Sequence, residues 1–261
     1  MTSALAHMQR VAEARSPEEL WQLHLTRMAA YGFDRVTYGF SRFLRDGSAV
    51  DTSDAIFLSN HSLGRPRREG EMSQLMRSPM FRWAMQNTGA QSWRWSAEQR
   101  AAGLLSSDEI AAMDQARAIG LTAGYTVSFP DLVPRGKGAM ALTARAGLDQ
   151  DAVDAVWAEK GEEIHTICTV THLRITHLPF AIQRRPLSPR QRETLEWVAE
   201  GKTTQDIAQI MQISPAMVEK HLRLAREALD VETTAHAVAK AAMMNHIFAA
   251  PHPAAPQNMA R

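Results

Sequence analysis

The sequence predicts an α+β N-terminal domain, an antiparallel sheet with helices on its faces, followed by an all-α domain of four short helices. Two observations predict this order. Residues 1–178 alternate between helical and strand periodicity, whereas residues 188–248 carry only helical periodicity, with start and stop signals that divide them into four short helices. A length of 261 residues leaves room for two modest domains.

The first helix is predicted by a capping box at Ser16, with Pro17 at the first helical position and Glu19 three residues after the cap. Its apolar face ends at Gly32. The same reasoning predicts strands at 36–43, 55–58, 124–129 and 139–144, and helices at 71–87 with a break at Ser78-Pro79, at 106–119 and at 149–177. Mixed helices and strands of this kind are typical of helices packed on an antiparallel sheet.

The domain boundaries follow from composition. Residues 1–178 form the predicted α+β domain, and 179–187 form a linker with prolines at Pro179 and Pro186. The four-helix domain spans 188–248. Residues 249–261 are rich in alanine and proline and are expected to be disordered.

Bulk composition indicates a soluble, cytoplasmic protein. Hydrophobic residues make up 45% of the chain and charged residues 22%. Cys168 is the only cysteine, which excludes an intrachain disulfide and suits a reducing cytosol. Met1–Arg10 has no long apolar run, and no segment approaches the roughly 20 apolar residues of a membrane span.

The charge balance is nearly neutral, with 29 basic and 28 acidic residues. Up to residue 183 the chain carries 19 basic and 20 acidic residues, and after it 10 and 8. Phosphate binding needs local Lys/Arg clusters rather than a global excess. A role with nucleic acid must therefore rest on where the charges lie.

The C-terminal helices are marked by their caps. Ser188 opens a second capping box, Thr203 and Thr204 cap the next helix, and Ser214-Pro215 starts a third. The third helix buries a stripe formed by Val218, Leu222, Ala225 and Leu229. The fourth helix is predicted at 234–248.

The outer face of the third helix is polar and partly basic, and the second and third helices are joined by a tight turn. This is the helix-turn-helix arrangement, in which one helix enters the major groove. Lys220 and Arg223 are the predicted base-reading residues. Thr203, Thr204 and Arg226 are the predicted phosphate contacts. The alternative is four packed helices with a solvated charged face.

The run LSPRQRETLEWVAEGKTTQDIAQIMQISPAMVEKHLRLAREALDVETTAHAVAKAA closely resembles the LuxR-type helix-turn-helix. The residues that carry the resemblance are Leu187, Pro189, Leu195, Gly201, Lys202, Ile207, Ala208, Ile213, Ser214, Val218, His221, Leu222, Leu229, Val231 and Ala237. The resemblance implies a transcriptional regulator that binds double-stranded DNA. It also implies a homodimer whose two copies meet through the fourth helix.

Three positions depart from that family. Gln191 replaces a glutamate but serves equally in a capping box. Met217 replaces a threonine and removes a phosphate contact. Glu219 stands where lysine is frequent; it is expected either to repel phosphate or to pair with Arg223 at i,i+4.

The N-terminal order of elements resembles the autoinducer-binding domain of quorum-sensing regulators, with local matches at Ser78-Pro79, Trp93 and Gly120–Gly124. The resemblance implies a pocket for an acyl-homoserine lactone between sheet and helices. Ser78 stands where the family has aspartate, and Arg65 and Glu69 stand in place of aromatic residues. We therefore predict a small hydrophobic ligand of a different kind or longer chain. The predicted lining is Ser78, Trp83, Trp93, Trp95 and Tyr125.

Alternatives remain open for this domain. The aromatic residues can instead be core, since aromatic side chains fill interiors by default. The regulator can also act without a ligand, or under control of a partner protein, with a degenerate pocket.

An enzyme is not expected, because the sequence has neither a glycine-rich phosphate loop nor a nucleophile elbow. No metal or cofactor is expected either. His165 and His172 are two helical turns apart, about 10 Å, which is too far to share one metal ion. Together with His177 they are predicted to lie at the surface or an interface.

Overall fold

A computed structural model describes residues 3–41, 55–61, 75–130, 136–178 and 186–248. The chain divides into two compact units, one of residues 1–14 and 18–174 and the other of residues 15–17 and 175–261. The first unit contains every strand of the described chain, and the second is helical.

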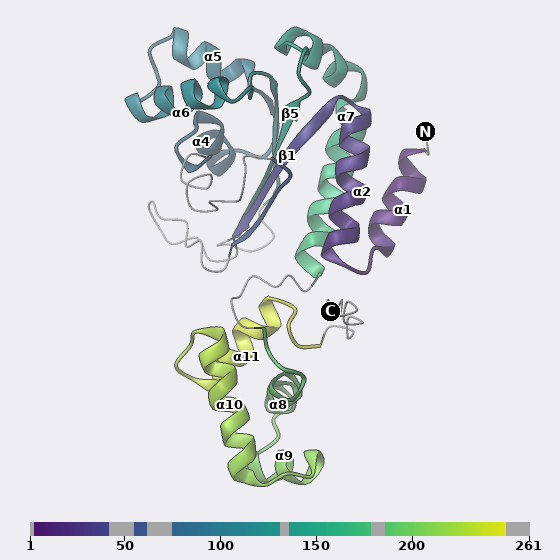
Figure 1. The fold of residues 1–261 in the computed structure, drawn as a ribbon, viewed down its shortest axis with the longest axis vertical. Coiled ribbons are helices and arrows are strands. Elements are labelled where there is room, and N and C mark those ends of the chain that lie inside the picture. The colour runs from purple at the N-terminus through teal and green to yellow at the C-terminus, as the bar shows by residue number, and fades with distance from the viewer. Residues whose placement is uncertain (1–2, 42–54, 62–74, 131–135, 179–185, 249–261) are drawn as a thin grey trace, which may run out of the picture. The chain divides into compact units, whose positions relative to one another are not determined.

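The N-terminal unit is built on a five-stranded antiparallel sheet of order β2-β1-β5-β4-β3 (Figure 1). The strands are β1 (Phe33–Ser41), β2 (Ile56–Ser59), β3 (Gly89–Ser92), β4 (Gly124–Ser128) and β5 (Lys137–Ala144). The central pair places Tyr38 opposite Met140. Because successive side chains of a strand face opposite sides of a sheet, Thr37 and Tyr38 project toward different helix layers.

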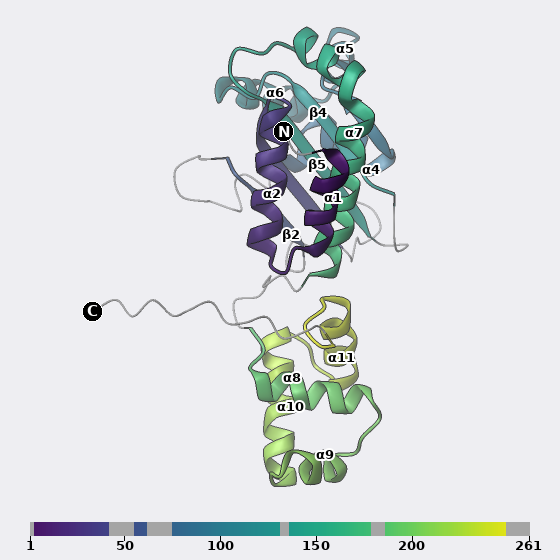
Figure 2. The same ribbon diagram turned by 90° about the vertical axis from the view of Figure 1, so that its right-hand side faces the viewer.

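Helices cover both faces of this sheet (Figures 1 and 2). Helices α2 and α7 lie against one face, with α1 beside them, and α4, α5 and α6 lie over the other. Their bounds are α1 (Ala4–Glu13), α2 (Pro17–Ala30), α4 (Pro79–Gln86), α5 (Arg94–Ala101), α6 (Ser107–Ala118) and α7 (Gln150–His177). The predicted α+β class and its antiparallel sheet are confirmed.

Three elements were not predicted. Helix α1 precedes the predicted first helix, and β3 and α5 lie in the segment between Asn87 and Ser106. Strand β3 has only four residues, Gly-Ala-Gln-Ser, without a β-branched or aromatic side chain. Such a segment gives no strand periodicity, so only its pairing with β4 makes it a strand.

The expectation of a surface position for His172 is wrong. His172 is 2% exposed. Its ring stacks on Phe129 with centroids 4.2 Å apart, and its Nδ1 lies 2.9 Å from the Tyr38 hydroxyl. The buried stripe of α7 advances by four residues at a time through Ile164, Cys168 and His172, so the core-facing side of the helix includes this histidine.

The C-terminal unit has the four predicted helices, α8 (Pro189–Ala199), α9 (Thr204–Met211), α10 (Pro215–Leu229) and α11 (Thr234–Met243). Its core is a single cluster, which includes Leu195, Ile207 and all four residues of the predicted stripe on α10. Across the described ranges, no helix is both long enough and apolar enough to cross a membrane.

Candidate ligand pocket and nucleic-acid interface

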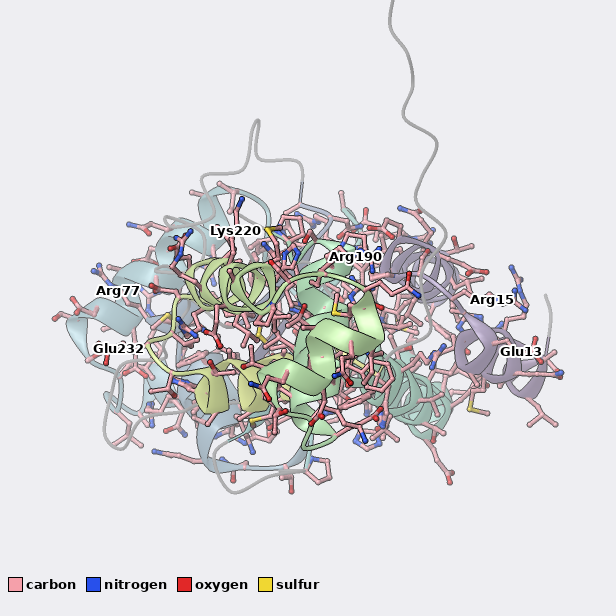
Figure 3. All side chains as sticks on the ribbon, turned by 90° about the horizontal axis from the view of Figure 1, so that it is seen from below. Glu13, Arg15, Arg77, Arg190, Lys220 and Glu232 are labelled. Atoms are coloured by element: carbon pink, nitrogen blue, oxygen red, sulfur yellow. The ribbon has the colours of Figure 1, made fainter. Side chains whose placement is uncertain are left out.

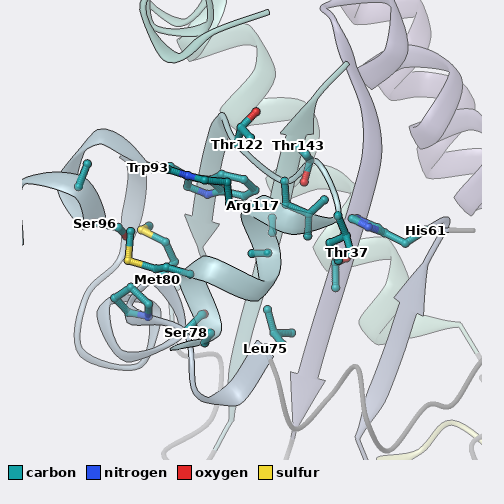
Figure 4. Close-up of a pocket in the computed structure, with 18 of the residues that line it drawn as sticks. Thr37, His61, Leu75, Ser78, Met80, Trp93, Ser96, Arg117, Thr122 and Thr143 are labelled. Atoms are coloured by element: carbon teal, nitrogen blue, oxygen red, sulfur yellow. The ribbon is translucent and has the colours of Figure 1, made fainter. Parts of the chain in front are cut away.

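A cavity of about 210 Å³ lies in the N-terminal unit between the sheet and helices α4, α5 and α6 (Figure 4). Its floor is formed by Thr37 of β1 with Ala141 and Thr143 of β5. The cavity is larger than the ~150 Å³ apolar cavity that holds a benzene molecule. It therefore has room for a small organic ligand.

Most of the wall is apolar, and polar groups are spread over it (Figure 4). Helix α4 supplies Met80, and its cap Ser78 also lines the cavity. The Ser78 hydroxyl accepts a hydrogen bond from the Phe81 N–H at 3.1 Å, so this side chain starts the helix as well as facing the pocket. A mainly apolar wall with a few placed polar groups is typical of small-molecule sites.

Trp93 is positioned in the cavity wall by a hydrogen bond and by the space that a glycine leaves for its ring. Its indole Nε1 donates to the Thr126 hydroxyl at 3.0 Å. A Cβ placed on Gly124 would lie 3.1 Å from the Trp93 ring and 2.3 Å from the Leu142 carbonyl oxygen. Only glycine at position 124 lets the indole lie this close to the sheet.

The cavity brings together two of the five predicted ligand residues, Ser78 and Trp93. The other three lie outside its lining. Trp83 is 8% exposed and packs with Met80 and Ala84, and Trp95 packs against the same cluster. The Arg82 guanidinium lies over the Trp95 ring at 5.6 Å.

Tyr125 lies outside the cavity because of strand alternation. Its neighbour Thr126 faces the cavity side, so Tyr125 projects to the opposite face of the sheet. There its ring stacks on Trp157 of α7, with centroids 3.9 Å apart. Burial, followed by a hydrogen bond with Asp154, raises the pKa of Tyr125 to about 12.

Several lining residues were missed by the sequence reasoning, among them His61, Ser96 and Arg117. His61 follows β2, Ser96 belongs to α5 and Arg117 to α6. No local pattern marks them, because three separate elements bring them to one cavity. Arg65 and Glu69, predicted to replace aromatic contacts, lie outside the described residues.

Helices α9 and α10 of the C-terminal unit form a tight helix-turn-helix. Gln212 ends α9 in the left-handed conformation with φ of 54°, and Ser214 caps α10 two residues later. The side of α10 opposite its buried stripe carries exposed Glu219, Lys220 and Arg223. This geometry leaves the polar face of α10 open, as a helix that enters the major groove requires.

The two predicted base-reading residues share this exposed face. Lys220 extends from α10 into solvent and has no hydrogen-bond or ion-pair partner among the described residues (Figure 3). Arg223 pairs with Glu227 one turn later, at 2.5 Å. The expected pairing of Glu219 with Arg223 is therefore wrong. Glu219 instead accepts a hydrogen bond from Thr204.

The three predicted phosphate contacts have partners within the module. The Thr203 hydroxyl caps α9 and bonds Asp206, while Thr204 donates to Glu219 at 2.9 Å. Arg226 donates to the Thr234 hydroxyl at the start of α11, at 2.8 Å. Any contact of these side chains with phosphate would have to share or replace these bonds.

Two protein-family models match the chain, one in each of its two units. The autoinducer binding domain matches residues 16–175, and the model of bacterial regulatory proteins of the luxR family matches residues 185–241. The first match alone covers more than half of the chain. The protein belongs to the LuxR family of regulators. It is a transcription regulator with an autoinducer-binding domain and a helix-turn-helix.

The chain is similar to several transcriptional regulators. RpaR of Rhodopseudomonas palustris, a quorum sensing-dependent transcriptional regulator, is 35% identical over 129 residues, 49% of this LuxR-family chain and 50% of RpaR. The transcriptional activator AnoR of Acinetobacter nosocomialis is 24% identical over 88% of this chain and 92% of AnoR. SdiA in complex with octanoyl-rac-glycerol covers 96% of this chain and all of SdiA, at 18% identity and a TM-score of 0.51. The last comparison supports the fold alone.

Proposed function

We propose that this LuxR-family protein is a cytoplasmic, homodimeric regulator that binds operator DNA sequence-specifically and senses a small hydrophobic ligand. The single observation that carries the sensing role is the cavity of about 210 Å³ between the sheet and α4–α6. It lies in the unit that matches the autoinducer binding domain. Ser78 and Trp93 are the proposed ligand contacts among the residues predicted from sequence.

An acyl-homoserine lactone is the first ligand to test, because RpaR is by name quorum sensing-dependent. A ligand that binds only the native state raises its stability by RT ln(1 + [L]/Kd), about 2.7 kcal/mol at a hundredfold excess over Kd. Thermal unfolding with a panel of acyl-homoserine lactones should therefore show a rise in melting temperature. No shift at saturating concentration would remove the lactone hypothesis.

DNA reading is assigned to α10, with Lys220 and Arg223 as the proposed base contacts. Their exposure on one face of a helix whose other face is core supports this role. Thr203, Thr204 and Arg226 are proposed to contribute phosphate contacts at the rim of this face. Binding of the full-length protein to duplex oligonucleotides, measured as a function of salt, tests the assignment.

A homodimer is proposed through α11. Ala235, Ala239, Ala242 and Met243 form an exposed apolar stripe along this helix. A second copy of α11 would cover this stripe and double the phosphate contacts on two half-sites. Sedimentation of the Ala239→Glu variant tests it: the variant should be monomeric and bind DNA weakly, whereas Ala199→Glu, on an exposed position of α8, should remain dimeric.

A ligand-independent regulator is the second candidate, because Ser78 provides no carboxylate for a ligand amide. A partner protein would then control DNA binding. Analysis of the protein purified from its own host distinguishes the ligand-sensing regulator from the ligand-independent one. Mass spectrometry should find a small molecule released on denaturation if the cavity senses a ligand. A consistently empty cavity together with full DNA binding would favour the second candidate.

A further inference from the structure

Two polar atoms in the wall of the N-terminal cavity have no hydrogen-bond partner among the described residues. They are the Ser96 hydroxyl of α5 and Nε2 of His61 after β2. Ser96 is 4% exposed, so its hydroxyl is shielded from bulk solvent. A buried polar group without a partner costs stability, and such groups are therefore rare unless a ligand satisfies them.

The two unpaired atoms lie on different sides of the cavity. Ser96 is next to Met80 on the α4–α5 side, and His61 is next to Thr37 on the β1 side (Figure 4). Burial lowers the pKa of His61, and the nearby Arg35 lowers it further. The neutral imidazole offers one N–H, and a serine hydroxyl offers one O–H.

The ionisable residues of the described lining are all basic. They are His61, Arg100 and Arg117, and the lining contains no Asp, Glu, Asn or Gln. Arg100 is held by Asp114 at 2.6 Å, and this carboxylate lies outside the lining. Arg117 forms no ion pair in the part of the chain that the structure describes. Among the described lining side chains, the hydrogen-bond acceptors are hydroxyls and one imidazole nitrogen, and none of them carries a negative charge.

The excess of basic over acidic side chains in the described lining favours one chemical class of ligand over another. An N-acyl amide brings an N–H that the described lining side chains can meet only with neutral acceptors, and one lone pair of Ser78 is already occupied by the Phe81 N–H. A carboxylate brings only acceptors, and hydrogen bonds to a charged acceptor are stronger than neutral ones. The wall supplies donors for it at Ser96, His61 and Arg117.

We propose that the cavity takes a small apolar carboxylate, with its chain against the Met80–Trp93 wall and its head hydrogen-bonded by Ser96 or His61 within the field of Arg117. The proposal rests on the sensing function above and specifies its ligand. It makes Arg117 and Ser96 determinants of specificity rather than of folding.

The test uses three probes of equal chain length: octanoate, octanamide and N-octanoyl-homoserine lactone. Their affinities for the full-length protein are measured by calorimetry, with melting temperature as a second readout. We expect octanoate to bind at least tenfold more tightly than either amide. Arg117→Gln should lower octanoate affinity about tenfold or more, and Ser96→Ala severalfold, with little effect on octanamide.

Matched control variants remove a guanidinium group and a hydroxyl group at positions outside the cavity. Arg145→Gln and Ser107→Ala change exposed residues that do not line it and should leave octanoate binding unchanged. Octanamide binding as tight as octanoate, or an Arg117→Gln loss no larger than that of Arg145→Gln, would overturn the proposal. Binding of the lactone but not of octanoate would overturn it while the sensing function stands. A protein that binds none of the three probes contradicts the sensing function itself.

Discussion

The Thr204 hydroxyl of α9 donates a hydrogen bond to the Glu219 carboxylate of α10, at 2.9 Å between oxygens. This bond joins the two helices of the helix-turn-helix on the face that we propose to meet DNA. It keeps a negative charge beside Thr204, which we propose to contact phosphate. We therefore expect the Glu219 carboxylate to limit nonspecific attraction to DNA.

Glu219→Gln should raise affinity for any duplex severalfold in dilute salt, because the variant keeps a hydrogen-bond acceptor but loses the repelling charge. The gain should shrink as salt rises, and fluorescence anisotropy at several salt concentrations measures it. Glu232→Gln removes an equal charge outside α10 and is expected to have a smaller effect. Weaker binding of Glu219→Gln on all sequences would contradict a repulsive role.

Arg223→Ala should lose about 1–3 kcal/mol of binding to the preferred operator and relax the preference for one base pair in each half-site. Selection from a randomised duplex library, compared with wild type, measures that preference. Lys220→Ala tests the neighbouring position in the same way. A uniform loss on every sequence would identify Arg223 as a phosphate contact instead.

Gly124→Ala should destabilise the N-terminal unit by about 1–3 kcal/mol, because the added methyl meets the Leu142 carbonyl and the Trp93 ring. Displacement of Trp93 should also weaken ligand binding. Urea unfolding followed by tryptophan fluorescence measures the stability. Gly39→Ala on β1 is the control, since a Cβ there meets nothing within 4 Å, and equal losses for both variants would refute the steric argument.

Acid should unfold the N-terminal unit by protonating histidines buried beside the sheet. Burial lowers the pKa of His24 to about 3 and that of His172 to about 4. Above pH 6.5 both states are neutral at these sites. Below pH 6.5 the unfolded chain binds protons at these histidines and the folded protein does not. The free energy of unfolding therefore decreases as the pH is lowered, down to about pH 4 for His172 and about pH 3 for His24.

Each of these histidines contributes a slope of about 1.4 kcal/mol per pH unit in that window. His172→Asn removes one ionisation and should flatten the pH dependence by that amount. It should also lower stability at pH 7.5, through lost stacking on Phe129. Tyr38→Phe removes the hydrogen bond to His172 but keeps the ionisation, so its slope should equal that of wild type. An unchanged slope for His172→Asn would exclude this source of acid sensitivity.

Local sequence determined most of the helices and the DNA-binding module. Caps and apolar periodicity predicted α2, α6, α7 and the four C-terminal helices, because these signals act within a few residues of the element that they define. The exposure of Lys220 and Arg223 followed for the same reason, since a period of 3.6 residues that buries Val218 and Leu222 turns these two side chains to the other side of α10.

Only the tertiary structure decided which side chains line the cavity and which are core. Tyr125 and Thr126 are adjacent in sequence, yet strand alternation places one against Trp157 and the other against Trp93. Ser96 and His61 reach one cavity from separate elements, and His172 is buried by the way α7 lies on the sheet. Local periodicity specifies a face of an element, whereas the packing of elements from distant parts of the chain specifies what that face meets.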